Sequence, residues 1–363
     1  MLGWLFFLWM MDQGSVVRFE GTEVFQPLDR EEVLVSPSGY VYILNFQDAY
    51  INYYSPDGQK IGKIGSRGKG PGEFTYAVQI LLQEGKLYVY DLLENQISVF
   101  SDTGKFQRRV TVPARGLKLV KVNSGWIYGN WEQFGLQELP ALFWVDEEFK
   151  QSRKLVSLEE KGEKRGLMVM TTDGKSQAKY SAIDTIPTLL GGLNGQKAYL
   201  VDGTRFRVEV IDHKGQMSFF ERKEKKIPFD TDWAAEQLAE AKENDQKLPK
   251  VETNYPEFFP AIREVIVDPD GHLVIDRWRG RPDDHHFPIA MDDRGQEVPL
   301  KYPWEVLERI VGFTDGFLFL TMYDKESEQA FVARVPAENV VSFATAHPIE
   351  FEGSAGRTIS ISN

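Results

Sequence analysis

The feature that most constrains the fold of this chain is a motif that occurs six times along it: an apolar strand, a tight turn around a glycine, and a second apolar strand. In the first copy, at residues 31–46, Gly39 separates the two apolar stretches of EEVLVSPSGYVYILNF. The glycines of the other five copies are Gly85, Gly125, Gly195, Gly271 and Gly316. Alternating side chains around a glycine turn are typical of a β-hairpin. The sequence therefore predicts six related hairpins.

The residues after each hairpin predict a second pair of strands. Each hairpin is followed by another apolar stretch that ends in a polar turn, as in QISVFSDTG at residues 96–104. Every unit therefore has four expected strands. Three of the five intervals between the motif glycines are 40 to 46 residues long, and the other two are 70 and 76. One repeating unit with two insertions, near residues 159–182 and 228–258, explains these intervals.

Four strands in a period of about 40–50 residues are the pattern of a β-propeller. A single four-stranded blade cannot bury both of its faces, whereas blades that pack radially against each other can. We therefore predict an all-β fold, a six-bladed β-propeller of four-stranded antiparallel blades over residues 15–363, with a short helical insertion. One terminal stretch, 15–20 or 357–362, is expected to complete the sixth blade and close the ring.

Two stretches resemble known propeller families. Residues 61–100 resemble an NHL repeat, with a glycine-rich joint, a strand pair that ends in YVYD, and a following NQISVF. The positions that match the NHL motif are Asp91, Asn95, Ile97, Val99 and Phe100. Residues 255–278 resemble the broader group of TolB-like six-bladed propellers. Both resemblances imply the fold rather than a function, because one fold serves many functions.

The glycine-rich stretch GSRGKGPGEF at residues 65–74 raises the question of a phosphate site. A phosphate-binding loop requires G-x-x-x-x-G-K-[ST] at the start of a helix. Here Lys63 stands in place of the first glycine, Gly70 stands in place of the Ser or Thr, and a strand-like sequence follows. We therefore interpret this stretch as the crossover from the outer strand of the first blade to the inner strand of the second.

Composition narrows the function classes further. The chain has 42 basic and 54 acidic residues and a net charge of −12, which argues against nucleic acid as a partner. It contains no cysteine, so disulfides, thiolate metal sites and cysteine nucleophiles are excluded. No G-x-S-x-G motif occurs, and the five histidines have no evident serine and acid partners, so we reject a serine hydrolase.

The N-terminal segment is strongly apolar, because the first 11 residues, MLGWLFFLWMM, contain no charged side chain. This run is shorter than the about 18–20 residues that a membrane-spanning helix needs. It resembles the apolar region of an export signal or a short anchor, and the alternative is a segment buried against this protein or a neighbour. We therefore separate residues 1–14 from the propeller. We expect an exported protein, periplasmic or extracellular, with membrane or hydrophobic contact through Met1 to Met11.

The direction of the strands predicts on which side of the ring each loop lies. In a meander, the turns between first and second and between third and fourth strands share one side, and the remaining connections share the other. The first set is short, whereas the second contains both insertions and the loops 65–74, 131–140 and 277–288. Insertions on one side of a repeat protein often mark its binding surface, so we expect a protein partner there. The candidate binding residues on this side are Arg67, Lys69, Trp131, Phe134, Arg277, Trp278, Arg279, His285 and His286.

The two insertions differ in character. In the second, residues 231–246 predict a short helix, with Asp232 as a cap and Ala234, Leu238 and Ala241 on one face. This apolar face could pack on the ring as a lid or on a partner, and we favour the lid. The first insertion mixes charged residues with the apolar LMVM, which fits a mobile loop or a hairpin that becomes ordered on a partner.

A reaction in the central channel is the alternative to a binding function. The second strands of the blades end in polar residues that are expected to form a ring: Asn45, Asp91, Asn130, Asp202, Asp276 and Thr321. Such a ring could hold a cation for a metal-dependent hydrolase, a lactonase or a lyase, which are activities of other six-bladed propellers. The same residue types also accept hydrogen bonds from strand-end turns in any propeller.

The DDHH stretch is a second place where a metal could bind. Its possible ligands are Asp283, Asp284, His285 and His286. Adjacent side chains in one loop rarely converge on an ion, and His213 and His272 belong to turns on the opposite side of the ring. A solvated polar loop is therefore the interpretation we favour.

These observations lead to one functional prediction and two alternatives. We predict a non-enzymatic protein-binding or scaffold propeller without a cofactor, which belongs to an exported or membrane-associated assembly. Arginine and aromatic residues are the types that anchor protein interfaces, and no set of acid, base and nucleophile is evident. The first alternative is the hydrolase, lactonase or lyase that uses the channel. The second is recognition of carbohydrate or peptide on the same side of the ring.

Overall fold

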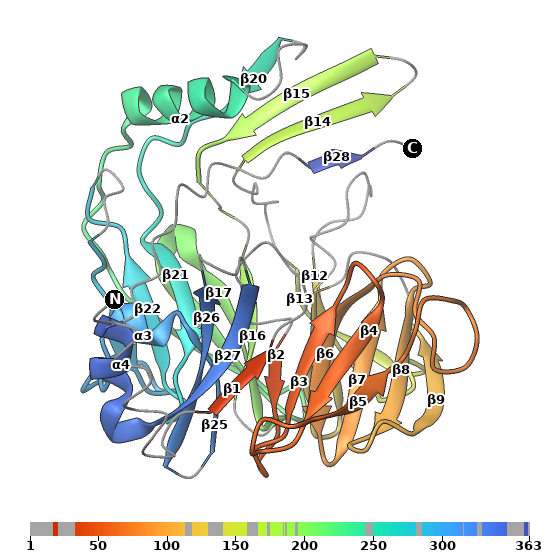
Figure 1. Cartoon of the computed structure of the whole chain (residues 1–363). Coiled ribbons are helices and arrows are strands. Elements are labelled where there is room, and N and C mark those ends of the chain that lie inside the picture. The colour runs from red at the N-terminus through yellow and green to blue at the C-terminus, as the bar shows by residue number, and fades with distance from the viewer. Residues whose placement is uncertain are drawn as a thin grey trace.

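The computed structural model confirms the predicted six-bladed β-propeller. It describes residues 17–20, 33–112, 118–129, 141–157, 166–172, 175–183, 185, 187–192, 195–243, 250–280, 285–314, 316–324, 329–346 and 359–361. Within these residues, six four-stranded antiparallel sheets form the blades, and a further sheet lies on one side of the ring (Figure 1).

Blades one to three follow each other along the chain, and each consists of four consecutive strands. Blade one contains β2 (Val33–Val35), β3 (Val41–Asn45), β4 (Tyr50–Tyr54) and β5 (Lys60–Ile64). Blade two contains β6 (Ala77–Gln83), β7 (Lys86–Asp91), β8 (Gln96–Ser101) and β9 (Phe106–Thr111). Blade three contains β10 (Lys118–Val122), β11 (Gly125–Gly129), β12 (Ala141–Val145) and β13 (Ser152–Ser157).

Blades four to six complete the ring. Blade four contains β16 (Thr188–Gly191), β17 (Lys197–Asp202), β18 (Arg207–Asp212) and β19 (Met217–Glu221). Blade five contains β21 (Ile262–Val267), β22 (Leu273–Arg277), β23 (Ile289–Met291) and β24 (Glu297–Val298). Blade six contains β25 (Ile310–Thr314), β26 (Phe317–Asp324), β27 (Gln329–Pro336) and, from the other end of the chain, β1 (Val17–Glu20).

The N-terminal strand closes the ring. β1 pairs antiparallel with β27, from Val17 opposite Arg334 to Glu20 opposite Phe331. The buried ring of Phe19 lies 6.1 Å from Tyr54 of blade one and 5.8 Å from Phe319 of blade six, measured between ring centroids. Of the two terminal stretches that the sequence left open, residues 15–20 therefore contain the closing strand.

Apolar packing between neighbouring blades explains the alternation along the strands. In β7, Leu87 and Val89 belong to the cluster shared with blade one, while Tyr88 and Tyr90 belong to the cluster shared with blade three. Successive side chains of a strand point to opposite faces, and a blade inside a ring has both faces buried. Six such clusters lie in the described part of the chain, one at each of the six blade interfaces.

The two insertions assemble into one structure that the sequence did not predict. β14 (Gly166–Thr172) and β15 (Lys175–Ser181) come from the first insertion, and β20 (Val251–Thr253) comes from the second. Together with β28 (Ile359–Ile361), they form a sheet in the order β20-β15-β14-β28, which we call the appended sheet. The edge strands β20 and β28 pair parallel to their neighbours. The first insertion is therefore a hairpin that pairs within the chain.

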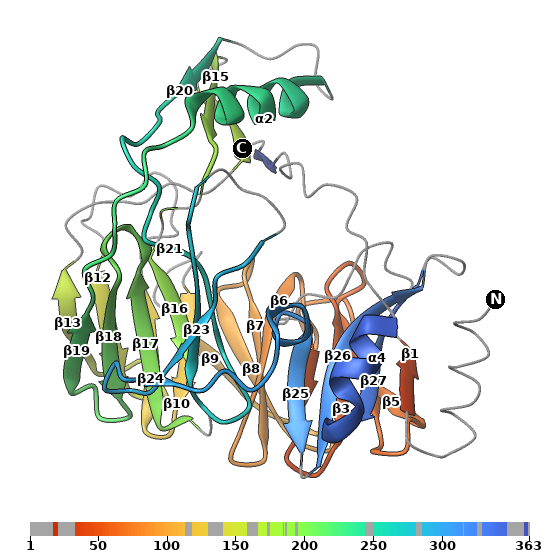
Figure 2. The same ribbon diagram turned by 90° about the vertical axis from the view of Figure 1, so that its left-hand side faces the viewer.

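The predicted helix is present as α2 (Thr231–Glu243), and residues 244–246 lie outside the described part. Its apolar residues Trp233, Leu238 and Ala241 are buried in one cluster with Ala178 and Tyr180 of β15. The preferred interpretation of a lid on the ring is corrected, because the apolar face of α2 packs on the appended sheet. Figure 2 shows α2 beside β15 and β20, away from the blades.

The remaining helical segments are short. They are η2 (Gly203–Arg205), α3 (Trp304–Leu307), η3 (Ala337–Asn339) and α4 (Val340–Ala346). Buried residues of α3 and α4 belong to the apolar cluster between blades five and six. Of the helices in the described part of the chain, none combines the length and apolar character needed to cross a membrane.

Candidate binding surface

Both insertions lie on the same side of the ring, as the strand directions predicted. Figure 1 shows the appended sheet and α2 together above one side of the blades. The short turns at the other ends of the strands, such as Ser36 to Tyr40 and Asp268 to His272, are closed by backbone hydrogen bonds of 2.8 and 2.9 Å. We call the side with the appended sheet the binding side.

Two connections join the appended sheet and α2 to blades four and five, and Figure 2 shows them between the ring and α2. They pair with each other through the backbone. The Phe229 N–H donates to the Glu257 carbonyl at 3.1 Å, and the Phe259 N–H donates to the Ile227 carbonyl at 2.8 Å. We call residues 227–229 and 257–259 the neck. Because its backbone groups are paired, the neck can hold a defined direction rather than act as a free linker.

Aromatic side chains fix the neck to the ring. The ring of Trp278, which follows β22, stacks on Phe259 with centroids 4.9 Å apart and an interplanar angle of 22°. Phe259 contacts Phe229 at 4.8 Å, and Phe229 stacks on Tyr255 at 5.7 Å. Trp233 of α2 packs against Phe229 at 6.2 Å. The predicted interface residue Trp278 therefore contributes to the anchoring of the appended sheet by this chain's own residues.

The polar end of β22 holds the following loop. The carboxylate of Asp276 is fully buried, and its Oδ1 accepts hydrogen bonds from the backbone N–H groups of Arg277 at 3.0 Å and Phe287 at 2.7 Å. Its Oδ2 lies 2.8 Å from Nδ1 of His286 and 3.7 Å from Nε of Arg263. Asp276 thus joins two predicted site residues, Arg277 and His286, in one cluster.

His286 connects this loop to the next blade. Its imidazole stacks on the indole of Trp304 in α3, with centroids 5.2 Å apart and an interplanar angle of 19°. Burial raises the pKa of the neighbouring Glu308, and a positive charge on His286 would lower it. A buried carboxylate beside Nδ1 can orient an imidazole as a general base. The same contacts also fix residues 285–288 to blade five, which is a structural role.

Three guanidinium groups surround one carboxylate beside this cluster. Nε of Arg222 lies 3.1 Å from Glu224, Nη1 of Arg277 lies 3.7 Å from it, and Nη1 of Arg279 lies 3.4 Å from it. Arg222 also pairs with Glu297. Burial lowers the pKa of Arg277, and the positive charge of Arg279 lowers it further. Arg277 and Arg279 are candidates from the sequence, whereas Glu224 is not among them, although its place in the charged stretch RKEKK could have indicated a charged site.

The glycine-rich stretch at residues 65–74 has internal partners that explain its composition. The N–H of Gly70 donates to the Glu73 carboxylate at 2.7 Å, and the guanidinium of Arg109 donates to the carbonyls of Gly70 and Glu73 at 2.7 and 3.1 Å. Gly65 has φ +80, and the ring of Phe74 occupies the space that a Cβ would need. The stretch is the crossover between β5 and β6, as predicted.

The two predicted binding residues in this crossover make local contacts. The guanidinium of Arg67 donates to the backbone carbonyl of Gln47. Nζ of Lys69 lies 2.9 Å from Glu94, and this hydrogen bond lowers the pKa of the Glu94 carboxyl. Both cations thus support loops of blades one and two. The other predicted residues on this side, Trp131 and Phe134, lie outside the described residues.

The described residues of the predicted channel ring make hydrogen bonds to turns, crossovers and neighbouring strands of the propeller. The Asp91 carboxylate accepts hydrogen bonds from the backbone N–H groups of Thr75, Tyr76, Leu93 and Glu94, at 2.6 to 3.2 Å. Of the other described members, Asp276 makes the contacts given above, Asn45 bonds to Asp48 and Tyr50, Asp202 bonds to Thr204 and Arg205, and Thr321 bonds to the Arg309 carbonyl. These contacts agree with the alternative interpretation of these residues, in which they accept hydrogen bonds at the ends of strands. Asn130 lies outside the described residues.

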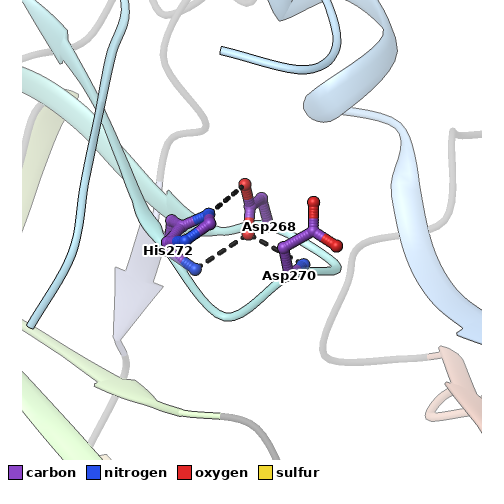
Figure 3. Close-up of side chains that lie close together, drawn as sticks. All are labelled: Asp268, Asp270 and His272. Atoms are coloured by element: carbon purple, nitrogen blue, oxygen red, sulfur yellow. Dashed lines mark hydrogen bonds and ion pairs between the residues drawn. The ribbon is translucent and has the colours of Figure 1, made fainter. Parts of the chain in front are cut away.

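A group of possible metal ligands lies at the opposite end of β22, in the turn of Asp268, Asp270 and His272 (Figure 3). One ligand atom from each lies within 4.8 Å of the others. The Asp268 Oδ1 accepts from the N–H groups of Asp270 at 2.9 Å and His272 at 2.8 Å, and Asp270 pairs with Lys301 at 3.2 Å. This group is not among the sites expected from the sequence, although the spacing D-x-D-x-H could have indicated it.

The geometry of the turn explains why an aspartate occupies position 268. At the equivalent position of other turns, Asp212 and Asp292 also accept two backbone hydrogen bonds through Oδ1, and no histidine follows at the same spacing. The carboxylate of Asp268 is therefore a turn-forming group of this propeller. Of the DDHH stretch, Asp283 and Asp284 lie outside the described residues, as do Met1 to Met11.

Comparison with known proteins supports the fold. Residues 31–164, which span blades one to three, match the model of the family DUF5128, described as a 6-bladed beta-propeller. The chain is a six-bladed β-propeller. No curated protein matches it.

Several solved structures are similar to this chain at low sequence identity. A "putative exported protein" from Bacteroides fragilis is 10% identical, over 88% of this chain and 94% of that chain, with a TM-score of 0.50. A member of the duf4221 family from Bacteroides vulgatus is also 10% identical, over 88% and 95% of the two chains, with a TM-score of 0.48. Virginiamycin B lyase from Staphylococcus aureus is 12% identical, over 88% and 98%, with a TM-score of 0.38. At these identities, the likeness concerns the fold alone.

Proposed function

We propose that this propeller is a non-enzymatic protein-binding or scaffold module, and that its binding surface is the side that carries the appended sheet. The observation that carries the proposal is the assembly of two insertions, which are separated in sequence by the whole of blade four, into one sheet with β28. The six apolar clusters between blades close the ring without this sheet. A structure built beyond what closure requires favours a role in recognition.

The polar residues near the ends of the strands give further support. Asp91 and Asp202, which a channel reaction would need as acids or metal ligands, accept backbone hydrogen bonds. Asp91 accepts them from Leu93 and Glu94 of its own turn and from Thr75 and Tyr76 of the preceding crossover, and Asp202 accepts one from Thr204. Such bonds hold the carboxylates in place for the turn. We interpret these residues as parts of the scaffold on which the binding side is built.

The cellular location is part of the proposal. The apolar residues 1–11 resemble the apolar region of an export signal or a short anchor. The similar propeller from Bacteroides fragilis is also described as exported in its name. We propose that this chain works outside the cytoplasm, in a membrane-associated assembly, and that it is related to NHL-repeat and TolB-like propellers through residues 61–100 and 255–278.

Isolation of the full chain from native membranes tests the proposal. Ala239 is an exposed residue of α2, and an arginine there would disturb a partner on this helix without entering the core. The matched control is Val341→Arg, at an exposed position of α4. We expect the wild type and Val341→Arg to retain one stoichiometric partner and Ala239→Arg to lose it. Recovery of the wild type solely as a free monomer would contradict the proposal.

A second candidate function is a lyase or hydrolase, and the Asp276–His286 pair is the observation that favours it. The buried carboxylate could hold the imidazole as a base for proton abstraction. Elemental analysis of the purified chain, together with His286→Gln, separates the two functions. Turnover that disappears in His286→Gln, or a stoichiometric metal that Asp91→Asn or Asp202→Asn removes, would favour the enzyme. Partner binding by His286→Gln favours the scaffold.

A further inference from the structure

Two basic stretches lie side by side at the base of the neck, on a chain whose net charge is −12. The first stretch, RKEKK at residues 222–226, leads from β19 toward the neck, and the second, RWR at residues 277–279, ends β22 and enters the following loop. They are brought together by Glu224, which pairs with arginines of both stretches. We call their cations the basic patch: Arg222, Lys223, Lys225, Lys226, Arg277 and Arg279.

The basic patch has more cations than carboxylates to balance them. The ion pairs of its arginines reach two carboxylates, Glu224 and Glu297. Lys223, Lys225 and Lys226 belong to the same short stretch and are exposed. Six cations next to two carboxylates leave a local excess of positive charge. This excess attracts an anionic group even though the whole chain is acidic.

The geometry around Glu224 is suited to another carboxylate. Its side chain is 12% exposed, and the contacts from Arg277 and Arg279 are 3.7 and 3.4 Å, which is longer than a good charge-assisted hydrogen bond. The two guanidinium groups therefore share one counter-ion at a distance and repel each other. A second carboxylate placed between them would accept donors from both groups. Guanidinium groups bind carboxylates in this way through parallel N–H donors.

An exposed aromatic residue borders the basic patch. The side chain of Phe287 is 42% exposed, and its backbone carbonyl accepts a hydrogen bond from Nε of Arg277 at 3.1 Å. On the other stretch, the ammonium of Lys226 lies 4.9 Å from the centre of the Phe258 ring. Arginine beside an exposed aromatic ring is the combination found at the energetic centres of protein interfaces.

We propose that the basic patch binds an acidic peptide segment of the partner, with carboxylates on Arg277 and Arg279 and an apolar side chain on Phe287. The inference rests on the proposed function and specifies the chemistry of the partner. A peptide is favoured over a nucleic acid because the negative charge of a peptide can be confined to one short acidic segment. A phosphodiester chain would continue from the basic patch onto a surface whose overall charge repels it.

A peptide selection on the full chain tests the proposal. Short random peptides displayed on phage are selected on the immobilised wild type, and the enriched peptides are then measured by fluorescence anisotropy. We expect enrichment of Asp and Glu next to an apolar residue. Binding to Arg277→Gln with Arg279→Gln should be at least about tenfold weaker, because charge-assisted hydrogen bonds are lost. The affinity should also fall as salt rises from about 0.05 to 0.3 M.

Two further variants keep the test decisive. Lys223→Gln with Lys225→Gln removes two exposed charges from the basic patch and leaves the contacts of Glu224 in place, so it should fold and bind about threefold to tenfold more weakly. The charge-matched control is Lys60→Gln with Lys105→Gln, at exposed positions outside the basic patch, and its affinity should equal that of the wild type. Equal losses in the control would overturn the proposal.

The outcomes also separate this proposal from the proposed function. The enriched peptides could be neutral, bind Ala239→Arg less tightly than the wild type, and bind the basic-patch variants as tightly as the wild type. This result would support the binding side and would show that the proposal of an acidic ligand is wrong. If no peptide is enriched and the chain carries no partner from native membranes, both are wrong. A labelled single-stranded oligonucleotide provides the last comparison. If it binds more tightly than the acidic peptides and loses affinity in the same variants, the ligand of the basic patch is a nucleic acid and the peptide proposal is wrong.

Discussion

At the scale of single residues, Lys121 shows how the ring tolerates a buried cation at the interface of blades two and three. Its side chain is 2% exposed, and Nζ lies 2.6 Å from the Val122 carbonyl and 3.1 Å from Glu147. The rings of Tyr88 and Trp126 have their centres 5.6 and 5.5 Å from the same atom. Burial lowers the pKa of Lys121, and the bond to Glu147 opposes this effect. The positive charge of Lys121 therefore depends on the carboxylate of Glu147.

Glu147→Gln should destabilise the fold because it leaves the Lys121 ammonium buried without a counter-charge. Loss of one partner of a buried pair costs several kcal/mol, and Glu147 is itself one-third exposed, so we expect about 2–3 kcal/mol. The neighbouring Glu148, which is 43% exposed and pairs with Arg108, provides the matched control. Glu148→Gln should cost less than about 1 kcal/mol. Urea unfolding at neutral pH measures both, and equal costs would contradict the account of Lys121.

The same pair predicts a pH dependence. Burial favours a raised pKa for Glu147, but the hydrogen bond and charge of Lys121 outweigh it and hold the pKa below its ordinary value of 4.5. The folded state therefore binds this proton less readily than the unfolded state does. The resulting stability is complete above pH 4.5 and is lost as the pH falls through the folded pKa. The difference in unfolding free energy between wild type and Glu147→Gln should shrink below pH 4.5, and a constant difference would be contrary evidence.

Residue types near the end of β22 could be recognised from the sequence, whereas their contacts could not. The sequence identifies Arg277 and His286 as candidate binding residues and Asp276 as a member of the channel ring. The contact between Asp276 and His286 joins residues ten positions apart, and the imidazole is also stacked on Trp304 of α3. Local sequence patterns contain no information on such contacts, because they are decided by tertiary packing.

At the scale of elements, strand pairing between sequence neighbours was predicted correctly, whereas pairing between distant strands was not predicted. The strands of blades one to five pair with their neighbours in sequence, so glycine turns and alternation predicted them. The appended sheet pairs Met168 with Ile359 and Ala178 with Val251, in parallel. Parallel neighbours need no hairpin turn, so their pairing leaves no local signal in the sequence. The helix α2 was predicted from its apolar spacing, but the surface on which it packs was not.

The neck gives a prediction at this scale. Phe259→Ala removes the ring that joins Trp278 of the propeller to Phe229 and Trp233, and it should lower the stability of the appended sheet by about 3–4 kcal/mol. The ring should remain folded because its six interblade clusters do not include Phe259.

Hydrogen exchange measures this separation directly. Amides of β15 should exchange faster in Phe259→Ala than in the wild type, and amides of β7 should keep their protection. The control is Phe219→Ala in β19, where the side chain is exposed, and it should leave both sets unchanged. Equal loss of protection in β15 and β7 would show that the appended sheet and the ring unfold as one unit.

At the scale of the whole molecule, the account depends on an asymmetry between the two sides of one ring. The ring closes through β1 and six apolar clusters, and its short turns face away from the appended sheet. The sequence predicted this arrangement because six glycine motifs set the number of blades and strand direction assigned both insertions to one side. It could not predict the appended sheet, the neck or the basic patch, because each combines segments that are far apart in the sequence.

The most direct test of the central claim is a density map of the assembly isolated from native membranes. The account predicts that the partner contacts α2, the appended sheet or the basic patch, on the side of the ring where the insertions lie. It also predicts that the turns at the other side, including Asp268 to His272, remain free of that partner. A partner seated only on those short turns, with the appended sheet uncovered, would contradict the account.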